Sequence, residues 1–373
     1  MSRVLVFGAG FMGRALAWDL CRQPGVERVH VVDISPERLR DTEALVASPK
    51  ARFSHLSVED SDGVDRALEG VSLALGAVSY QYNARFTDTC IRAGAHFVDL
   101  GGNDAIVDAQ FAMHDRAKAA GVAILPDCGL APGLAGILGM HVYNQLPGCD
   151  EIHLRVGGLP QHPVPPLDYM LVFSVHGLIN EYKEPVRILE EGALKTVPGM
   201  SHVEEITFPA PFGPMEAFYT SGGVSTLVKT LEGRVRDMDY KTIRYPGHAA
   251  RIQLLMDLGF FDEAAGPDGR SPRDFTEAHL AQRLALKDQD LILLRVWGRN
   301  TARSLTYECI DREDPTTGLT AMMRMTAFPA AIIGQMLLSG EIPGRGVLRQ
   351  ELAVPADRMI AELARRGVEI REQ

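Results

Sequence analysis

Residues 126–136 read PDCGLAPGLAG and hold a single carboxylate, Asp127, between a proline and a glycine-rich turn. The apolar run 122–125 before them predicts a strand, and the pattern after them is helical. A carboxylate at the end of a strand can take up a proton or bind a cation, as a general acid or base does. It can equally accept hydrogen bonds from backbone N–H groups and cap the following helix. Asp127 is therefore a candidate catalytic residue with a structural alternative.

Three glycines near the start form the pattern G-x-G-x-x-G, at Gly8, Gly10 and Gly13, between a predicted strand and a predicted helix. In a dinucleotide-binding turn the first glycine permits a tight bend and the second lets the backbone approach a pyrophosphate, while the third lets helix and strand pack closely. The N–H groups that open the helix would then face the phosphates. On its own, the pattern also fits a plain glycine-rich turn.

Asp33 ends the second predicted strand, 20 residues after the third glycine, where a dinucleotide site needs an acid for the ribose hydroxyls. A carboxylate there repels a 2′-phosphate, so the sequence favours NAD, while Arg38 and Arg40 keep NADP as the alternative. Asp33 could instead cap the next helix, although Ser35 is better placed, directly before a proline. The residues that we expect to contact the cofactor are Gly8, Gly10, Phe11, Met12, Gly13, Asp33, Ile34, Ala77, Val78 and Gly101.

The composition is that of an ordinary globular protein, with 46% hydrophobic residues, a net charge of −10 and a pI near 5.6. This acidic balance disfavours a nucleic-acid or anionic membrane surface, because both partners need a basic face. No apolar run approaches the ~20 residues that cross a bilayer, and no signal peptide precedes the first strand. The five cysteines form no CxxC and no Cys/His metal spacing, so we expect reduced thiols, no metal site and a cytoplasmic protein.

Strand-like and helical runs alternate over the first 130 residues, which predicts a parallel sheet with helices on both faces. The expected strands are 3–8, 28–33, 72–78, 96–100 and 122–126, and the expected helices are 12–22, 36–46, 64–68, 83–93 and 104–120. In an open sheet of this kind the ligand lies outside the carboxyl ends of the strands. Asp127 and the glycine turn both fall at such ends.

From about residue 150 the runs become typical of an antiparallel sheet. The expected strands are 151–160, 168–175, 203–210, 216–221, 239–245 and 291–298, and helical patterns return at 329–342 and 355–367. The predicted fold class is α/β, a Rossmann-type doubly wound parallel sheet with an inserted α+β domain that contains a largely antiparallel or mixed sheet. We expect the NAD-binding Rossmann domain at residues 1–130 plus 327–373, and the inserted substrate-binding and dimerisation domain at residues 131–326.

Nine short motifs follow one another along nearly the whole chain. They are GAGFMG (8–13), YQYN (80–83), VDLGG (98–102), PDCGLAPG (126–133), VGGLP (156–160), PPLDY (165–169), FGPMEAF (212–218), TSGGVSTL (220–227) and YKTIRYPGH (240–248). Together they resemble the saccharopine dehydrogenase-like family, and most closely its NAD-dependent L-lysine 6-dehydrogenase branch. Saccharopine reductases tend to carry DPG where this sequence has Asp127-Cys128-Gly129, which is a departure from the saccharopine-specific pattern.

The resemblance implies a Rossmann domain, an inserted mixed sheet that also builds a homodimer, and oxidation at a carbon that bears an amine. For the lysine branch, L-lysine, NAD and water would give allysine (2-aminoadipate 6-semialdehyde), ammonia and NADH, and the aldehyde would cyclise to piperideine-6-carboxylate. The ε-ammonium of lysine has a pKa of ~10.4, so a base must remove a proton before a hydride can leave. The same base could activate the water that attacks the iminium.

Several side chains could supply this base. Asp127 is the first candidate for a carboxylate that faces the amine, and Tyr80 could relay a proton or simply pack. Asp99 could bind substrate or orient the nicotinamide ribose. His248 could be the base at neutral pH, although a lone histidine after a Pro-Gly turn is more often a surface or core residue. Lys241 would need strong desolvation for that role.

Other side chains could hold the amino-acid end of a substrate. Arg244 is the best candidate to clamp a carboxylate, because a guanidinium fork matches two carboxylate oxygens. Glu216 could pair with the α-ammonium or be solvated. Thr220 and Ser221 precede two glycines and could approach a ligand closely, or form a simple β-turn.

Two other functions stay open. A saccharopine-type reductase would join an α-keto acid to an amine, and it would need a second cation for the second carboxylate. A dinucleotide-binding regulatory protein would bind the cofactor without turnover, but the polar residues at the strand ends beyond the cofactor turn disfavour it. Within the first interpretation, the substrate could be lysine or a relative such as ornithine.

Overall fold

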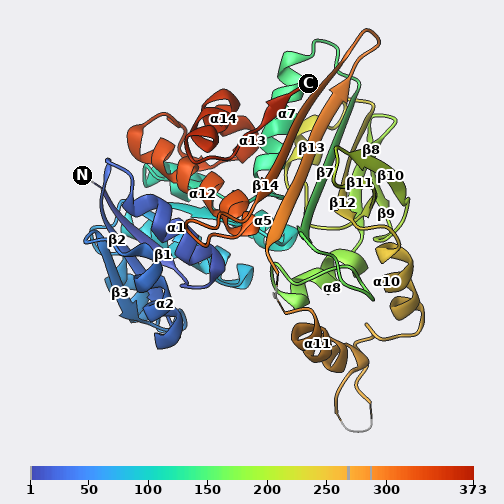
Figure 1. Cartoon of the computed structure of the whole chain (residues 1–373). Coiled ribbons are helices and arrows are strands. Elements are labelled where there is room, and N and C mark those ends of the chain that lie inside the picture. The colour runs from blue at the N-terminus through green and yellow to red at the C-terminus, as the bar shows by residue number, and fades with distance from the viewer. Residues whose placement is uncertain (1, 267–268, 286–287) are drawn as a thin grey trace. The chain divides into compact units, whose positions relative to one another are not determined.

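The computed structural model describes residues 2–266, 269–285 and 288–373, and the chain divides into two compact units (Figure 1). The first unit comprises Met1–His141, Pro315–Leu319 and Met323–Ile370. The second comprises Val142–Asp314, Thr320–Met322 and Arg371–Gln373. The boundaries differ from the expected ones. Residues 131–141, 315–319 and 323–326 were assigned to the inserted domain but belong to the first unit, and residues 371–373 were assigned to the Rossmann domain but belong to the second unit.

Over the described ranges, the first unit contains a sheet of seven parallel strands in the order β15-β6-β5-β4-β1-β2-β3. The strands are β1 (Ser2–Phe7), β2 (Val26–Asp33), β3 (Ala51–His55), β4 (Leu73–Gly76), β5 (His96–Asp99), β6 (Ala123–Leu125) and β15 (Gly346–Val347). The order reverses at β1, which is the hallmark of a doubly wound fold with its ligand crevice at that point. The predicted Rossmann-type sheet is confirmed.

The helices of this unit connect successive strands or come from the C-terminal part of the chain. They are α1 (Phe11–Cys21), α2 (Pro36–Val46), α3 (Ser61–Ala67), η1 (Tyr80–Tyr82), α4 (Asn83–Ala93), α5 (Asp104–Phe111), α6 (His114–Ala119), α7 (Leu134–Gln145), α12 (Ala321–Ser339), α13 (Gln350–Ala353) and α14 (Ala356–Arg365). Helix α7 runs across the boundary between the two units.

Aromatic packing fixes the middle of the first unit. The rings of Phe7 and Phe86 stack at 4.2 Å between centroids, and Phe97 meets Phe86 edge-on at 6.1 Å. All three are fully buried. This cluster packs β1, α4 and β5 against one another, with Phe7 at the last position of β1.

Three local expectations for the first unit were wrong. Strand β3 was missed because its ARFSH sequence is mostly exposed and carries no apolar run, as an edge strand permits. Strand β15 was missed because two residues carry no periodic signal. The single helix expected at 104–120 is two helices, α5 and α6, separated at residues 112–113.

The second unit is built on a mixed sheet, with the main strand order β10-β11-β12-β7-β13-β14-β16 and with β8 and β9 attached beside β12. The strands are β7 (Glu151–Pro160), β8 (Val186–Glu190), β9 (Ala193–Val197), β10 (Glu204–Phe208), β11 (Gly213–Tyr219), β12 (Asp237–Arg244), β13 (Asp290–Arg299), β14 (Ser304–Arg312) and β16 (Arg371–Glu372). The pairing of β12 with β7 is parallel, while the other pairings are antiparallel. The predicted largely antiparallel or mixed sheet is confirmed.

Helices α8 (Val175–Lys183), α9 (Leu227–Leu231), α10 (His248–Asp257) and α11 (Pro272–Arg283) complete this unit. The strand expected at 168–175 is wrong, because residues 168–174 form a turn and an irregular segment that leads into α8. Ser174 caps that helix by accepting a hydrogen bond from the Gly177 N–H, and this local capping stops the apolar run from continuing as a strand.

Helix α12 has the length and apolar composition that would let it cross a membrane, with a mean hydropathy of 1.3 over its apolar window. In the structure 78% of that window is buried inside the protein. The apolar residues of α12 are thus accounted for by packing in the interior.

We expect Gly13→Ala to destabilise the first unit and Gly10→Ala to leave it nearly unchanged. A Cβ on Gly13 would lie 1.8 Å from the Gly8 carbonyl oxygen, whereas a Cβ on Gly10 would meet nothing within 4 Å. Overpacking against backbone costs on the order of 1–3 kcal/mol or more. Thermal unfolding of both variants without cofactor measures the difference, and equal losses would contradict this account of the turn.

Candidate functional site

The glycine turn lies at the carboxyl end of β1. Gly8 has φ +104°, and a Cβ there would lie 2.6 Å from the carbonyl oxygen of Ala77 at the end of β4. Gly10 precedes α1 as its N-cap and makes no side-chain cap hydrogen bond, and the first turn of α1 contains no acidic residue. The opening N–H groups of this helix therefore suit a phosphate.

The Asp33 carboxylate is tied to the same turn. One oxygen, Oδ2, accepts from the Ala9 N–H at 2.7 Å, and Oδ1 accepts from the Ser35 N–H at 2.7 Å. Ser35 itself caps α2, with its hydroxyl accepting from the Arg38 N–H at 3.3 Å. Asp33 is therefore not the N-cap of α2. Its carboxylate lies beside the glycine turn, in the position from which it could accept hydrogen bonds from the ribose hydroxyls of a dinucleotide.

The remaining cofactor candidates surround this turn. Phe11 and Ile34 are 49% and 63% exposed, although both side chains are large and apolar. Ala77 and Val78 are partly exposed at the end of β4, and Met12 is partly exposed in the first turn of α1. A dinucleotide fits this arrangement of open space at Gly10, a helix α1 without a side-chain cap or acidic first turn, and exposed apolar side chains.

A second group of candidates gathers at the ends of β4, β5 and β6. The Asp99 carboxylate accepts hydrogen bonds from the Gly101 N–H at 2.8 Å, the Gln110 side-chain amide at 2.7 Å and the Asp127 N–H at 3.1 Å. Its backbone carbonyl accepts from the Cys128 N–H at 2.8 Å. Burial raises the pKa of Asp99 to about 6, against the lowering effect of these hydrogen bonds. Asp99 therefore acts as a positioning residue that joins the two loops.

Asp127 is held at the centre of this group. It is 2% exposed and has φ +60°, the left-handed region that few non-glycine residues occupy. A Cβ on Gly101 would lie 1.9 Å from Asp127 Oδ1, so only glycine leaves room for this carboxylate. A Cβ on Gly102 would lie 3.2 Å from the ring of Tyr80, so the same loop also contacts Tyr80.

Asp127 does not directly precede the helix that follows it in the sequence. Helix α7 begins only at Leu134, and a turn in which Leu134 N donates to Gly129 O intervenes. Gly129 and Gly133 also form an isolated bridge that keeps this turn tight. The structure thus brings Tyr80, Asp99 and Asp127 together at one edge of the parallel sheet.

In the second unit, Arg244 ends β12 and is 2% exposed. Its Nε donates to the Tyr182 hydroxyl at 3.2 Å, and Nη1 donates to the Ile243 carbonyl at 2.9 Å. The guanidinium carbon lies 4.6 Å from the centroid of the Tyr169 ring. Among the described residues, Nη2 of Arg244 has no hydrogen-bond partner, so the buried cation keeps a donor for an anion.

His248 stands behind this arginine. It is 1% exposed, its Nδ1 lies 2.9 Å from the Leu167 carbonyl, and its Nε2 lies 3.0 Å from the Tyr182 hydroxyl. Nδ1 must donate to the carbonyl, so Nε2 accepts from Tyr182. Burial, with Arg244 nearby, lowers the pKa of His248 to about 3. His248 is thus neutral at pH 7, and both ring nitrogens are engaged, which makes it an orienting residue for Tyr182 and Arg244.

Two polar side chains beside Arg244 were missed in the sequence. The hydroxyl of Tyr169 is buried and makes no hydrogen bond among the described residues, and the residue is 5% exposed. Burial raises the pKa of Glu181 to about 7, while Arg244 lowers it and Glu184 raises it. Tyr169 is the last residue of the PPLDY motif, but the motif does not indicate what its hydroxyl contacts, and Glu181 lies within a helix and belongs to no motif. Their role follows only from their place around Arg244.

The other candidates of the second unit have structural partners. Glu216 accepts from the Gly247 and Ala249 N–H groups at 2.8 Å and 2.5 Å, at the start of α10. The Thr220 hydroxyl lies 2.6 Å from that of Thr242, on the Arg244 face of the sheet. The Ser221 hydroxyl donates to Glu184 at 3.0 Å. Glu216 therefore serves the helix start.

Lys241 lies on the opposite face of β12 from Arg244. Its ammonium donates to Glu204 at 2.6 Å, and Glu204 also accepts from Arg155, which pairs with Asp239 as well. These ion pairs form a network on the sheet. Lys241 thus has a partner of its own and stands apart from the Arg244 group.

Comparison with known proteins identifies the family. Residues 4–125 match the saccharopine dehydrogenase NADP binding domain, and residues 129–368 match the saccharopine dehydrogenase C-terminal domain. The chain belongs to the saccharopine dehydrogenase family. The resemblance found in the sequence is confirmed at this level, while its assignment to the lysine 6-dehydrogenase branch stays a prediction. Membership implies a nicotinamide dinucleotide cofactor.

Individual relatives are distant. The chain is 25% identical over 280 residues to an α-aminoadipic semialdehyde synthase of Arabidopsis thaliana. The matched region covers 70% of this chain but only 25% of that protein. It is 22% identical to a carboxyaminopropylagmatine dehydrogenase of Synechocystis, over 99% of this chain and 96% of that one. The apo structure of the L-Glu-forming saccharopine dehydrogenase from Saccharomyces cerevisiae has the same fold, with a TM-score of 0.83, 17% identity and coverage of 100% and 99%.

The free energy of unfolding should decrease as the pH is lowered, because His248 takes up a proton more readily in the unfolded state. A folded pKa of about 3 lies below the ordinary 6.5, so the unfolded state binds the proton first. The stabilisation present above pH 6.5 is therefore lost as the pH falls towards 3, by about 1.4 kcal/mol per pH unit. Urea titrations at pH 7.0 and 4.5 should show a loss about 2–3 kcal/mol larger in the parent protein than in His248→Gln.

The exposed His162, replaced as His162→Gln, is the matched control and should keep the full loss. If the His248→Gln variant shows the same pH dependence as the parent protein, the buried neutral state of His248 is wrong.

Proposed function

We propose that this protein is an NAD-dependent amino-acid dehydrogenase that oxidatively deaminates L-lysine at its ε carbon. The products would be allysine (2-aminoadipate 6-semialdehyde), which cyclises to piperideine-6-carboxylate, and ammonia. The observation that carries the proposal is the Arg244 group of the second unit, a buried cation with a spare donor beside an acid. That pair matches the carboxylate and ammonium of an amino acid.

The α-carboxylate would be recognised by Arg244. Its guanidinium is oriented by the hydrogen bond to Tyr182, which His248 fixes in turn. The Tyr169 hydroxyl can add a second donor, since it is buried and makes no hydrogen bond among the described residues. Two donors in a dry site make a strong carboxylate clamp, because charge-assisted hydrogen bonds gain strength at low dielectric.

The α-ammonium would be recognised by Glu181. Burial raises the pKa of its carboxyl to about 7, so much of it is protonated at neutral pH. A substrate ammonium favours the ionised form and would lower this pKa again. Glu216 is a weaker candidate for this role, since two backbone N–H groups hold its carboxylate at the start of α10.

The first unit contains the side chains that could act on an amine. When bound, a nicotinamide dinucleotide would accept a hydride from the carbon that carries the amine. Asp127 is our candidate for the group that removes the amine proton and then the proton of the attacking water. Asp99 would keep it in place through the hydrogen bond to its backbone N–H, and Tyr80 could relay the proton.

The choice of NAD over NADP depends on Asp33. Its carboxylate lies against the glycine turn through Ala9 and would repel a 2′-phosphate. The family description names NADP, and Arg38 and Arg40 keep NADP as the alternative cofactor.

A saccharopine-type reaction is the second candidate, because the matched family and the yeast protein of the same fold carry that name. Such a reaction joins an amino acid to an α-keto acid, and it would need a further cation for the second carboxylate. Around Arg244, the described residues supply one guanidinium with a spare donor.

L-Lysine with NAD alone should give NADH, followed as absorbance at 340 nm, with at least ~10-fold lower kcat/KM for NADP. L-Ornithine, which is one methylene shorter, serves as the comparison substrate and should react more weakly. If NAD(P)H is consumed only when lysine and an α-keto acid are supplied together, the saccharopine-type function replaces the proposed one.

Replacing Arg244 by alanine should reduce kcat/KM for L-lysine by about 10²-fold and leave the KM for NAD unchanged. With 1-aminopentane, which lacks the carboxylate and the α-amine, the parent protein and the variant should differ by less than ~3-fold. Lys241→Ala, on the other face of the same strand, is the matched control. Equal losses on both substrates would reject the clamp.

A further inference from the structure

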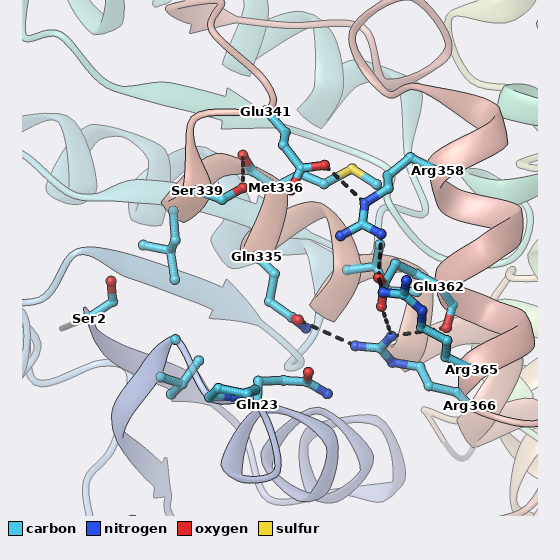
Figure 2. A pocket seen from close by; sticks show the side chains of 15 residues that line it. Ser2, Gln23, Gln335, Met336, Ser339, Glu341, Arg358, Glu362, Arg365 and Arg366 are labelled. Atoms are coloured by element: carbon cyan, nitrogen blue, oxygen red, sulfur yellow. Dashed lines mark hydrogen bonds and ion pairs between the residues drawn. The ribbon is translucent and has the colours of Figure 1, made fainter.

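The polar side chains of the first unit differ in whether the protein itself supplies their hydrogen-bond partners. At the amino ends of β1 and β2, a cavity of about 490 Å³ is lined in part by residues of α12 and α14 (Figure 2). The arginines of this cavity are ion-paired with carboxylates, and Gln335 bonds to Asp19 and Arg366. These side chains are engaged by the protein, so they do not indicate a ligand.

Asn83, the last residue of the YQYN motif, differs from them. It begins α4 and is 3% exposed. Its Oδ1 is buried and has no hydrogen-bond partner among the described residues. The side chain does not cap its helix either, since the N-cap of α4 is Tyr82. A buried acceptor without a donor is unfavourable, and it therefore calls for a donor from outside the chain.

Asn83 lies between the two functional parts of the first unit. A Cβ on Gly76 would lie 3.3 Å from Asn83 Oδ1 and 3.4 Å from the Cβ of Asp99, so the amide lies at the carboxyl end of β4. In the sheet, Gly76 pairs with Phe7 of β1 on one side and with Asp99 of β5 on the other. The glycine turn follows Phe7, and Asp99 holds the loop that carries Asp127.

A dinucleotide bound at the glycine turn would have to cross this place to reach Asp127. The strand order is β6-β5-β4-β1, so the ends of β4 and β5 separate the turn after β1 from the loop after β6. Beyond the pyrophosphate, the cofactor consists of a ribose and the nicotinamide ring. The ring carries a carboxamide, which has one carbonyl acceptor and two N–H donors and needs partners at these strand ends.

A second primary amide is a complementary partner for a carboxamide. Each of the two groups has one carbonyl oxygen and one NH₂, so two N–H···O bonds can form side by side. Asn83 Oδ1 would accept from the carboxamide N–H, and Asn83 Nδ2 would donate to the carboxamide oxygen. The terminal torsion of an asparagine is soft, so the amide can turn towards a ligand at little cost.

The neighbouring amide of Gln110 does not have this freedom. Its Oε1 is also buried without a partner among the described residues, but its Nε2 donates to Thr87 at 3.0 Å and to Asp99 at 2.7 Å. These two bonds fix the amide, and the residue is fully buried. Gln110 therefore supports Asp99, and Asn83 is the amide that remains for a ligand.

We propose that Asn83 binds the carboxamide of the nicotinamide ring through a pair of hydrogen bonds. This pairing sets the rotation of the ring about its bond to the ribose, and therefore which face of the ring is turned towards the loops of Asp99 and Asp127. The inference rests on the nicotinamide cofactor and on the part of the proposed function that places its ring near Asp127. It does not depend on lysine as the substrate.

Isothermal titration calorimetry without substrate tests this role on the full chain. The ligands are NADH and ADP-ribose, which lacks the nicotinamide ring. Asn83→Leu keeps the size of the side chain and removes its amide. It should raise the Kd for NADH about 5-fold to tenfold and change the Kd for ADP-ribose by less than ~2-fold.

The reduced 3-acetylpyridine analogue of NAD tests the bond to Oδ1 itself. In this analogue a methyl group replaces the NH₂ of the carboxamide, so it cannot donate to Asn83. The parent protein should bind it at least ~3-fold more weakly than NADH, and Asn83→Leu should bind the two within ~2-fold of each other. A purely structural asparagine would leave this discrimination unchanged.

Two controls separate binding from folding. Gln335→Leu removes an amide at the other end of the strands, beside the cavity of Figure 2, and should leave every Kd unchanged. In thermal unfolding without ligand, Asn83→Leu should not lower the Tm, because Oδ1 has no hydrogen bond to lose among the described residues. Asn103→Ala should lower the Tm, because Asn103 caps α5 by accepting from Ala105 and Ile106.

Three results would overturn the proposal. They are an NADH Kd that Asn83→Leu leaves unchanged, equal losses for NADH and ADP-ribose, and a parent protein that binds the acetylpyridine analogue as tightly as NADH. The same series with NADPH and the 2′-phosphate of ADP-ribose separates the role of Asn83 from the choice between NAD and NADP. If these binding results hold and L-lysine is not oxidised, the substrate assignment fails and the role of Asn83 stands.

Discussion

The buried carboxylate of Asp99 joins the two loops on which the chemistry of the first unit depends. It accepts hydrogen bonds from Gly101, Gln110 and the Asp127 backbone, and so sets both the loop after β5 and the loop after β6. Burying this group costs free energy, which appears as a pKa raised to about 6. The three donors offset that cost, so the carboxylate can remain ionised at neutral pH. Without it, nothing in the parallel strands themselves would fix the left-handed turn at Asp127.

The second unit orients its cation by a comparable chain of hydrogen bonds. The Leu167 carbonyl fixes the ring of His248, His248 fixes the Tyr182 hydroxyl, and Tyr182 accepts from Arg244. The orientation of each side chain determines that of the next, because a neutral histidine must donate at one nitrogen and accept at the other. The guanidinium is thereby preorganised before any ligand arrives, which reduces the entropy lost on binding.

Spare hydrogen-bonding capacity separates the functional candidates from the structural ones. Glu216, Lys241 and Asp99 are charged and lie near the sites, yet protein partners engage them. Arg244 and Tyr169 retain donors among the described residues. The same distinction separates Arg366, the C-cap residue of α14, which Asp19, Glu362 and Gln335 engage, from Arg365, whose side chain is 67% exposed. The residue type alone does not show which of these side chains already have hydrogen-bond partners in the protein.

The sequence by itself determined the parallel sheet, the glycine turn and the place of Asp33. These features depend on local periodicity and on backbone conformations that glycine permits, which neighbouring residues in the chain specify. It also gave the family, through motifs such as PDCGLAPG, and it placed Ser35 correctly as the cap of α2. The sequence analysis missed edge strand β3, because its residues are mostly exposed and therefore form no apolar run.

Only the tertiary structure decided which polar side chains have partners. His248 became a neutral orienting residue because Leu167 and Tyr182 reach it from distant segments, and Glu216 became a helix-start acceptor because α10 begins beside β11. Glu181 joined the site because helix α8 packs near Arg244. Burial and hydrogen-bond partners arise between residues far apart in the chain, and spacing along the sequence does not encode them.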